Sequence, residues 1–164
     1  MNKNIDFSVA DICDDHPQSI QVANLALISY GAKDSFFGEI ETIQCPDDNS
    51  LVKDILNTPG NNRVLIIDAS GVSHASMVGD QIAAKAAENN WNGIIVNGFI
   101  RDVEILKTIP IAIYAKGSIP KKTDKNGMGD IGAEVFVGGI LIKPKNWVYF
   151  DSNGWVISKK ELKL

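Results

Sequence analysis

Short apolar runs alternate with amphipathic stretches through the centre of the chain. Residues 64–68 (VLIID), 93–97 (GIIVN) and 111–116 (IAIYAK) are apolar runs of strand length. Between them, residues 80–90 (DQIAAKAAENN) and 102–109 (DVEILKTI) space their apolar positions as one face of a helix does. Apolar strands that alternate with helices indicate βαβ units, so we expect a parallel sheet at the centre of the fold.

The two flanks of this centre follow different patterns. The N-terminal flank predicts helices at 9–14, 19–27 and 48–58, the last beginning at Asp48 or Asn49, and a strand at 36–45. The C-terminal flank has β-type runs at 134–139, 140–144, 147–150 and 154–158. The segments 69–79 and 98–101 are expected to be loops. No linker rich in Pro, Gly or Ser divides the chain, so the pattern predicts one α/β domain over residues 1–164 with an additional β layer.

Composition narrows the class of protein. The chain has 164 residues, of which 45% are hydrophobic and 22% charged, as in a globular domain. No apolar run reaches the roughly 18 residues of a membrane span, and the N-terminus lacks the apolar core of a signal peptide, so we expect a cytoplasmic protein without membrane contact. The net charge of −4 argues against direct nucleic-acid binding, which favours a basic face.

Few residues could hold a soft metal ion. The two cysteines, Cys13 and Cys45, form no CxxC pair and no disulfide framework, and we expect both to be reduced and buried. With only His16 and His74 besides, a zinc site is not indicated. The abundant carboxylates favour a hard cation such as Mg²⁺ or Mn²⁺.

The stretch from Gly79 to Asp102 brings charged residues to its two ends. In a right-handed βαβ unit the helix runs antiparallel to its strands. An eleven-residue helix rises about 17 Å and a five-residue strand about 16 Å, so the two lengths nearly cancel. Asp80 should therefore lie beside Arg101 and Asp102 at the carboxyl edge of the sheet, where ligands of open α/β sheets bind.

These residues have two interpretations. In the first, Gly79 allows a tight turn, the amides of Gln81 and Ile82 hold an anion at the helix start, and Arg101 binds a carboxylate or an enolate oxygen. The two aspartates would then bind a divalent cation or its waters. In the second, Asp80 and Asp102 are ordinary N-caps, and Arg101 pairs with one of them.

The same residues carry a family resemblance. RVLIIDASGVSHASMVGDQIA, GIIVNGFIRDVEIL and FVGGILIKPKNWVYFDSNGWVIS resemble the strand–loop–Gly-Asp segment, the Arg-Asp turn and the C-terminal β segment of regulator of ribonuclease E activity A (RraA) and the related 4-hydroxy-4-methyl-2-oxoglutarate aldolases. VADICDDHP is similar to the N-terminal helix of that family. The resemblance spans nearly the whole chain and implies a layered β/β/α, swivelling-domain-like fold.

The resemblance also implies a reaction and a set of roles. The Asp–twenty residues–Arg-Asp pattern, which is typical of catalytically competent members, is present as Asp80, Arg101 and Asp102. It implies that Asp102 binds Mg²⁺ or Mn²⁺ and that Arg101 binds substrate and stabilises an enolate. Asp80 would orient waters or Arg101, and the backbone from Gly79 through Gln81 to Ile82 would hold the pyruvyl carboxylate. The implied reaction is cleavage of a 4-hydroxy-2-oxo acid to pyruvate, with oxaloacetate decarboxylation as a side activity.

The chain departs from the family pattern at three places. His74 and Ala75 stand where basic residues are usual. Ile105 stands where some members have an acid, and Glu104 lies one residue early. Longer aldolases contribute a C-terminal acid from a neighbouring subunit, for which Glu161 is only a weak match. The resemblance implies a homotrimer, or a dimer of such trimers, and the alternative function of a non-catalytic regulator that binds and inhibits ribonuclease E.

Other chemistry-bearing residues have simpler explanations. Lys85 or Lys116 could form a Schiff base, but we expect both on the exposed surface. Residues 127–132 (GMGDIG) match a dinucleotide fingerprint, yet they follow a polar segment and precede a β-type run, so we expect a turn. His74 lies in the loop before Gly79, where it is either a ligand or an ordinary loop residue.

Overall fold

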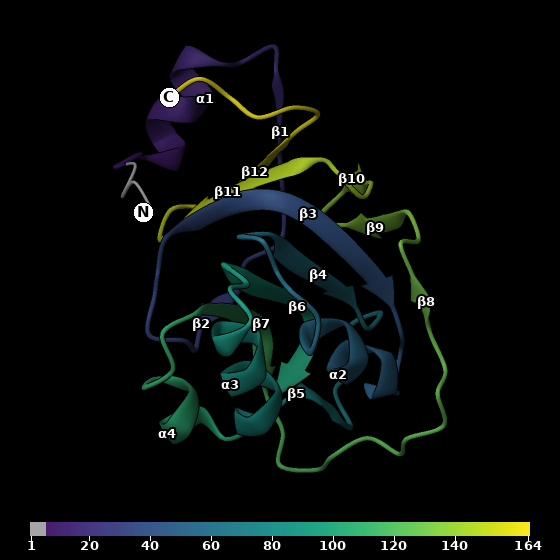
Figure 1. Ribbon diagram of the computed structural model, residues 1–164. Helices are drawn as coiled ribbons and strands as arrows, with labels where there is room; N and C mark the ends of the chain where they lie inside the picture. Colours follow the sequence, from purple (N-terminus) through teal and green to yellow (C-terminus); the bar gives the residue numbers. More distant parts are fainter. Residues whose placement is uncertain (1–5) are drawn as a thin grey trace.

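The computed structural model describes residues 6–164, built around a curved sheet of ten strands (Figure 1). The strand order is β1-β12-β11-β3-β4-β6-β7-β2, with β5 beside β6 and β8 beside β3, while β9 and β10 form a separate hairpin. The strands are β1 (Ile20–Val22), β2 (Ile28–Ser29), β3 (Phe36–Gln44), β4 (Val64–Asp68), β5 (Ser76–Val78), β6 (Gly93–Ile100), β7 (Ala112–Ser118), β8 (Asp130–Ile131), β9 (Val135–Val137), β10 (Ile140–Ile142), β11 (Trp147–Asp151) and β12 (Gly154–Ser158). The helices are α1 (Val9–Asp15), α2 (Ser50–Leu56), α3 (Asp80–Glu88) and α4 (Val103–Leu106).

The parallel centre is confirmed. Strands β3, β4, β6 and β7 pair in parallel, and every residue of β4 is buried because helices cover one face and the C-terminal strands cover the other. Such strands must be apolar on both faces, which explains their continuous apolar runs. None of the helices within residues 6–164 is long and apolar enough to cross a membrane.

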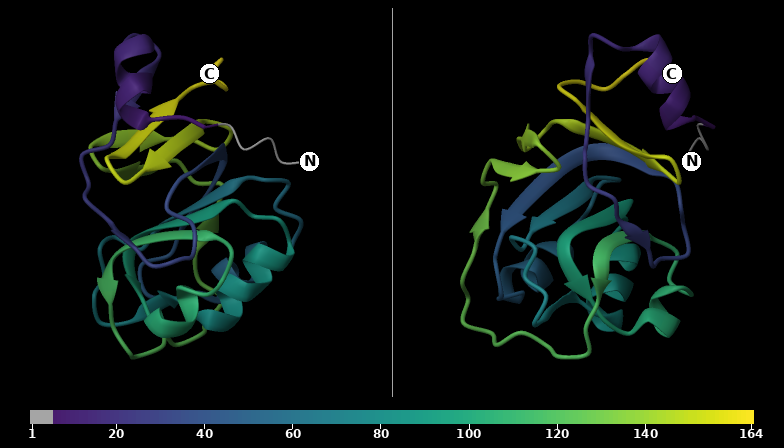
Figure 2. Two further views of the ribbon diagram at one scale, coloured as in Figure 1. Left: turned by 90° about the vertical axis from the view of Figure 1, so that its left-hand side faces the viewer. Right: turned by 180° about the vertical axis from the view of Figure 1, so that it is seen from behind.

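Strand β3 joins the two β layers. Its first residues, Phe36–Glu39, pair with β11, and its later residues, Ile40–Gln44, pair with β4. One core lies between the sheet and helices α2 and α3, and a second lies between the sheet and the C-terminal strands. The resulting mixed α/β fold of β, β and α layers is the one expected from the sequence (Figure 2).

The predicted helix at 19–27 is wrong. Residues 20–22 form β1, which pairs with β12, and the chain then continues extended, with the Ala23 amide donating to the Trp155 carbonyl. Ala23, Leu25 and Leu27 pack on the second core. Their spacing of two residues fits an extended segment, which the helical interpretation overlooked.

Two predicted loop segments are strands. The three residues of β5 pair with the far end of β6, and β6 continues to Ile100 where a loop was expected. Strands β4 and β5 thus flank successive parts of the long β6, and the loop 69–75 connects them. Because β6 has eight residues and not the five assumed, the rise of the helix and the rise of the strand do not cancel as estimated. The helix still starts at the carboxyl edge, because β5 extends the first arm of the βαβ unit.

The segment 119–129, which follows β7, crosses the edge of the sheet and is held by the start of α2. The buried Asp48 carboxylate accepts hydrogen bonds from the amides of Ser50, Asn126 and Met128 at 2.7 to 3.0 Å, and another from the Ser50 hydroxyl. Burial alone would raise the pKa of Asp48, but these donors hold its pKa below the ordinary value. Asp48 thus tethers the segment 119–129 to α2, beyond the expected role as a helix cap.

We expect Asp48→Asn to lower the free energy of unfolding by about 2 kcal/mol at pH 7, because charge-assisted hydrogen bonds are lost. The depressed pKa makes this contribution fully present above about pH 4 and lost as the pH falls toward the folded-state pKa. Urea titrations followed by tryptophan fluorescence over this range would measure it. Asp54→Asn, at an exposed position of the same helix, is the control. Equal stability of Asp48→Asn and the wild type at pH 7 would contradict the tether.

Candidate functional site

Strands β5 and β6 bring the two ends of the 79–102 stretch together. The Arg101 amide donates to the Val78 carbonyl at 3.0 Å, which fixes the two strand ends side by side. The Asp80 amide then donates to Asp102 Oδ2 at 3.0 Å. The prediction that Asp80 lies beside Arg101 and Asp102 at one sheet edge is therefore confirmed.

Gly79 leaves the space that this contact needs. A Cβ atom at residue 79 would lie 2.7 Å from Asp102 Oδ2 and 3.4 Å from Arg101 Nε. The backbone of Gly79 is extended, at φ −123°, so any residue could adopt its conformation. A side chain here would displace the Asp102 carboxylate from this contact, whereas the backbone conformation itself would tolerate one.

Asp102 adopts a left-handed backbone conformation, with φ 62° and ψ 41°. This region is uncommon for residues other than glycine, although Asp is among those that tolerate it. Asp102 occupies the N-cap position of α4, yet its side chain makes no capping hydrogen bond there and instead contacts the start of α3. Asp80 is the first residue of α3 rather than its cap. The N-cap interpretation is therefore wrong for Asp80. For Asp102 it holds in position but not in the capping hydrogen bond, and the pairing with Arg101 that it included is present.

The predicted anion cradle at the start of α3 is partly filled by the protein. Asp80 Oδ1 accepts the Gln81 amide at 2.8 Å, and the Asp80 amide is engaged by Asp102. The Ile82 amide has no acceptor within residues 6–164. A substrate carboxylate could bind Ile82 directly, and would reach the Gln81 amide only by displacing the Asp80 carboxylate.

Arg101 is held in place from two sides. Its Nε lies 3.7 Å from Asp102 Oδ2, and its Nη1 donates to the Pro120 carbonyl at 3.5 Å. The side chain is 38% exposed. One edge of the guanidinium is thus oriented by protein groups while the remainder faces the cleft.

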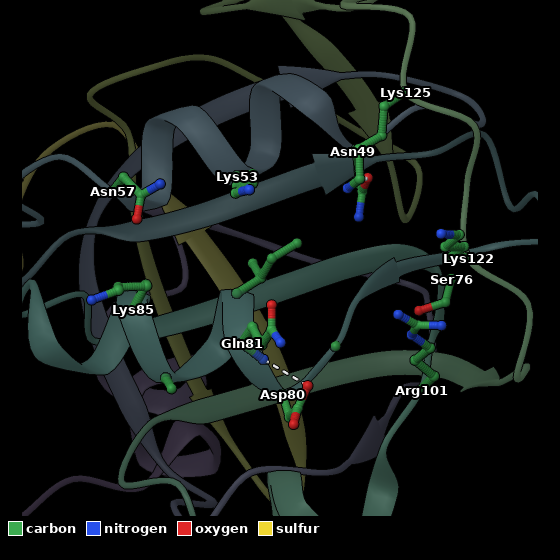
Figure 3. Close-up of a pocket in the computed structure, with 13 residues that line it drawn as sticks. Asn49, Lys53, Asn57, Ser76, Asp80, Gln81, Lys85, Arg101, Lys122 and Lys125 are labelled. Carbon is green, nitrogen blue, oxygen red and sulfur yellow. Dashed lines mark hydrogen bonds between the residues drawn. The ribbon is translucent and has the colours of Figure 1, made fainter.

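Gly79, Asp80 and Arg101 are among the residues that line a cleft of about 600 Å³ between α2, α3 and the segment 119–129 (Figure 3). Asp80 is the one acidic residue among the 13 described residues that line it. Five lining residues are cationic: Lys53, Lys85, Arg101, Lys122 and Lys125. The sequence pattern gave no sign that Lys122 and Lys125 line a cleft, because their place beside it depends on the path of the tethered segment.

The donor set suits a water-rich metal site rather than a closed protein cage. Asp102 Oδ1 makes no hydrogen bond within residues 6–164, and Asp80 lies beside it. No group of three His, Cys, Asp or Glu residues in the described part of the chain could hold a metal ion. Mg²⁺ commonly retains several waters and binds through one or two carboxylates together with substrate oxygens. Asp102, with Asp80 nearby, fits a cation of that kind.

Three other candidate residues, His74, Lys85 and Lys116, are exposed, and of these Lys85 alone is among the described residues that line the cleft. His74 lies 3.6 Å from Asp47, and both side chains are about two-thirds exposed. Lys85 is exposed and pairs with Glu88 at 2.9 Å. Lys116 is exposed and does not line the cleft.

The glycine-rich segment and the cysteines are not part of the site either. Residues 127–132 form an exposed turn that contains β8 and precedes a strand, so no nucleotide-binding helix follows them. Both cysteines are free, but only Cys45 is fully buried, since Cys13 is half-buried. Burial and the charges of Asp48 and Asp68 raise the pKa of Cys45 to about 12, so its thiol stays protonated and unreactive.

Comparison with known proteins gives a consistent result over nearly the full chain. A family model described as RraA-like: Aldolase/RraA matches residues 9–157. Proteins of Hahella chejuensis and Azotobacter vinelandii are each 42% identical over 154 residues, or 94% of this chain, and span 94% and 95% of the relatives. Both are named "Putative 4-hydroxy-4-methyl-2-oxoglutarate aldolase".

Two solved structures share the fold closely. A Geobacillus kaustophilus protein, described as an S-adenosylmethionine: 2-dimethylmenaquinone methyltransferase, has a TM-score of 0.93 and 35% identity, covering 95% of this chain and 97% of that one. A Thermus thermophilis protein, described as the RNA-processing inhibitor RraA, has a TM-score of 0.93 and 28% identity, covering 97% and 96%.

The left-handed backbone at residue 102 can be tested through stability. Asp102→Gly and Asp102→Ala both remove the carboxylate, but only alanine retains a Cβ in the disfavoured conformation. We expect Asp102→Gly to be more stable than Asp102→Ala by about 1 kcal/mol. Chemical denaturation of the two variants measures the difference. The reverse order of stability would refute the assigned backbone conformation.

Proposed function

The chain belongs to the RraA-like (Aldolase/RraA) family, and we propose that it is a divalent-metal-dependent aldolase that releases pyruvate from 4-hydroxy-4-methyl-2-oxoglutarate or a related 4-hydroxy-2-oxo acid. The observation that carries the proposal is the contact of the Asp80 amide with the Asp102 carboxylate beside Arg101, at a cation-lined cleft. The relatives named as aldolases support the same reaction class. The matched family model covers residues 9–157 in one piece, in keeping with a single domain.

Binding would begin with the 2-oxo acid end of the substrate. The unpaired Ile82 amide at the positive end of α3 can donate to its carboxylate. The Arg101 guanidinium, oriented by Asp102 and the Pro120 carbonyl, can donate to the keto oxygen. A Mg²⁺ or Mn²⁺ ion at Asp102 would supply Lewis-acid polarisation of that keto group.

Cleavage then requires one proton acceptor and one anion stabiliser. The 4-hydroxyl proton leaves to a base, the C3–C4 bond breaks, and C4 becomes a carbonyl carbon. The electron pair of the broken bond forms the pyruvate enolate, whose charge Arg101 stabilises, and return of a proton to C3 then gives pyruvate. Asp80 Oδ2 makes no hydrogen bond within residues 6–164, and we propose that this cleft carboxylate accepts the proton, directly or through one water. Oxaloacetate decarboxylation yields the same enolate, so we include it as a side activity.

The charge of the cleft argues against a methyltransferase reaction like that ascribed to the Geobacillus relative. S-adenosylmethionine carries a sulfonium cation. Five cationic side chains and one carboxylate line this cleft, and this balance disfavours a cationic cofactor. Anionic oxo acids suit the same lining.

A regulatory role is the second candidate. It draws on the Thermus relative, which is described as an RNA-processing inhibitor. We propose it only as a binding function, to ribonuclease E, that would use a surface outside the cleft. Retention of the chain on immobilised ribonuclease E, measured beside pyruvate release, separates the two functions.

Assembly into a homotrimer, or a dimer of such trimers, is part of the proposal. Phe136 and Leu141 pair across the β9–β10 hairpin and expose apolar side chains, 69% and 48% accessible in the single chain. Contact between copies would cover them. Sedimentation analysis would give the number of copies.

We expect Asp102→Asn to lower metal-dependent pyruvate release from oxaloacetate by at least about a hundredfold, because the amide keeps the shape but removes the charge that holds the cation. Lactate dehydrogenase-coupled assays with Mg²⁺, with and without chelator, measure it. Asp14→Asn, at an exposed carboxylate of α1, is the matched control and should retain full activity. Unchanged turnover in Asp102→Asn would refute the metal assignment.

A further inference from the structure

Four asparagines of the chain are followed by glycine: Asn92, Asn97, Asn126 and Asn153. An Asn-Gly pair can deamidate without an enzyme, because glycine has no side chain to hinder the attack of its backbone nitrogen on the preceding asparagine side chain. The attacking amide must first leave its own hydrogen bond and move toward that side chain. The fold therefore decides which of the four pairs reacts.

Two of the pairs are held by strand β6. Gly93 and Gly98 both lie in this strand and are buried. The side chain of Asn92 donates to a backbone carbonyl of β3 at 2.9 Å, and that of Asn97 donates to the carboxylate at the end of β4 at 2.9 Å. Both the attacking amide and the asparagine side chain are thus held at these two pairs.

The third pair closes the hairpin between β11 and β12. Gly154 is the first residue of β12 and pairs with Asp151. The Asn153 amide donates to Asp151 Oδ1 at 2.8 Å, which fixes the turn. The attacking amide at this pair again belongs to a strand.

The fourth pair, Asn126 and Gly127, lies outside every helix and strand of the described chain, and both residues are exposed. The Asn126 side chain makes no hydrogen bond within residues 6–164. Gly127 has a positive φ of 70°, and no other atom lies within 4 Å of the place that a Cβ would take. This pair therefore has the open space that ring closure needs.

The attacking amide is also the least firmly held of three successive amides. The amides of Asn126 and Met128 donate to the charged Asp48 carboxylate at 2.7 and 3.0 Å. The Gly127 amide between them donates to the neutral Ser50 hydroxyl at 3.2 Å. Because hydrogen bonds to a charged acceptor are the stronger ones, the Gly127 amide is released first.

We propose that Asn126 and Gly127 form a site of spontaneous deamidation, and that isoaspartate at residue 126 releases the segment 119–129 from Asp48. A solvent base removes the proton of the Gly127 nitrogen, which forms a bond to Asn126 Cγ. The side-chain nitrogen leaves as ammonia, and a cyclic succinimide remains. Water then opens the ring at either carbonyl, giving aspartate or isoaspartate.

Isoaspartate changes the tether in two ways. The backbone gains a methylene group between the amides of residues 126 and 127, so the two amides that share Asp48 Oδ2 can no longer reach it together. A new carboxylate also lies beside the buried charge of Asp48 and repels it. Lys122 and Lys125 line the cleft from this segment (Figure 3), so its release changes the cleft whatever reaction takes place there.

The test follows the four pairs in the full chain during incubation at mildly alkaline pH. Peptide mass spectrometry that distinguishes isoaspartate from aspartate gives a rate at each asparagine. We expect Asn126 to react at least about tenfold faster than the other three, because its amide opens at the lowest free energy. In the urea-unfolded chain this excess should disappear. A rate at Asn126 no higher than at the other pairs of the folded chain, or the same excess in the unfolded chain, would overturn the assignment.

Ser50→Ala removes the acceptor of the Gly127 amide. It should raise the rate at Asn126 by roughly threefold or more, since one hydrogen bond no longer opposes the attack. The rates at the other three pairs are the control and should not change, because they report on the stability of the whole chain. An unchanged rate at Asn126 would contradict the role of the Gly127 amide.

Release of the segment is measured by proteolysis. Anion exchange separates the deamidated chain by its added negative charge, and trypsin should cleave its isoaspartate form after Lys125 about tenfold faster than the unmodified chain. Asn126→Gln, whose longer side chain closes a ring far more slowly, should keep the original cleavage rate after the same incubation. Equal cleavage of the isoaspartate form and the unmodified chain would refute the release.

Discussion

The Asp102 carboxylate lies 3.0 Å from the backbone amide of Asp80, and the rest of the site depends on this contact. It requires a residue without a side chain at Gly79, and it requires residue 102 to turn left-handed at the end of β6. One carboxylate oxygen is thereby fixed at the start of α3, while the other makes no hydrogen bond within residues 6–164. Arg101, the preceding residue, is oriented by the same carboxylate. The Asp102 side chain thus links the start of α3, the end of β6 and the charge of Arg101.

The sequence was most informative where the pattern of buried residues fits only one type of secondary structure. Strands β4, β6 and β7 are buried on both faces, and their continuous apolar runs identified them. The meeting of Asp80 with Arg101 and Asp102 was also predicted, although for an incomplete reason. The estimate used a five-residue strand, whereas β6 has eight residues and β5 supplies the missing length.

The errors have a common physical origin. Segments stabilised by distant partners carry weak local signals. Residues 20–22 pair with β12, and β5 pairs with the end of β6, so neither could be recognised from its own spacing. The cationic lining of the cleft was missed for the same reason. Lys122 and Lys125 are far along the chain from the helices that they face, and the tether at Asp48 holds their segment beside the cleft. Charge counted along the sequence gave no sign that an acidic protein would build a cationic cleft.

The pairing of N-terminal with C-terminal elements affects the order in which the chain can fold. Strand β1 pairs with β12, and the Val9 amide donates to Asp151, 142 positions further along the chain. The parallel centre from β3 to β7 can assemble from residues 36–118 once they leave the ribosome. Among the described elements, α1 and β1 precede β3 to β7 along the chain, and β1 must wait until β12 emerges before it gains its partner. Such long-range pairings slow folding, and they leave the N-terminal segment exposed to proteases and chaperones throughout synthesis.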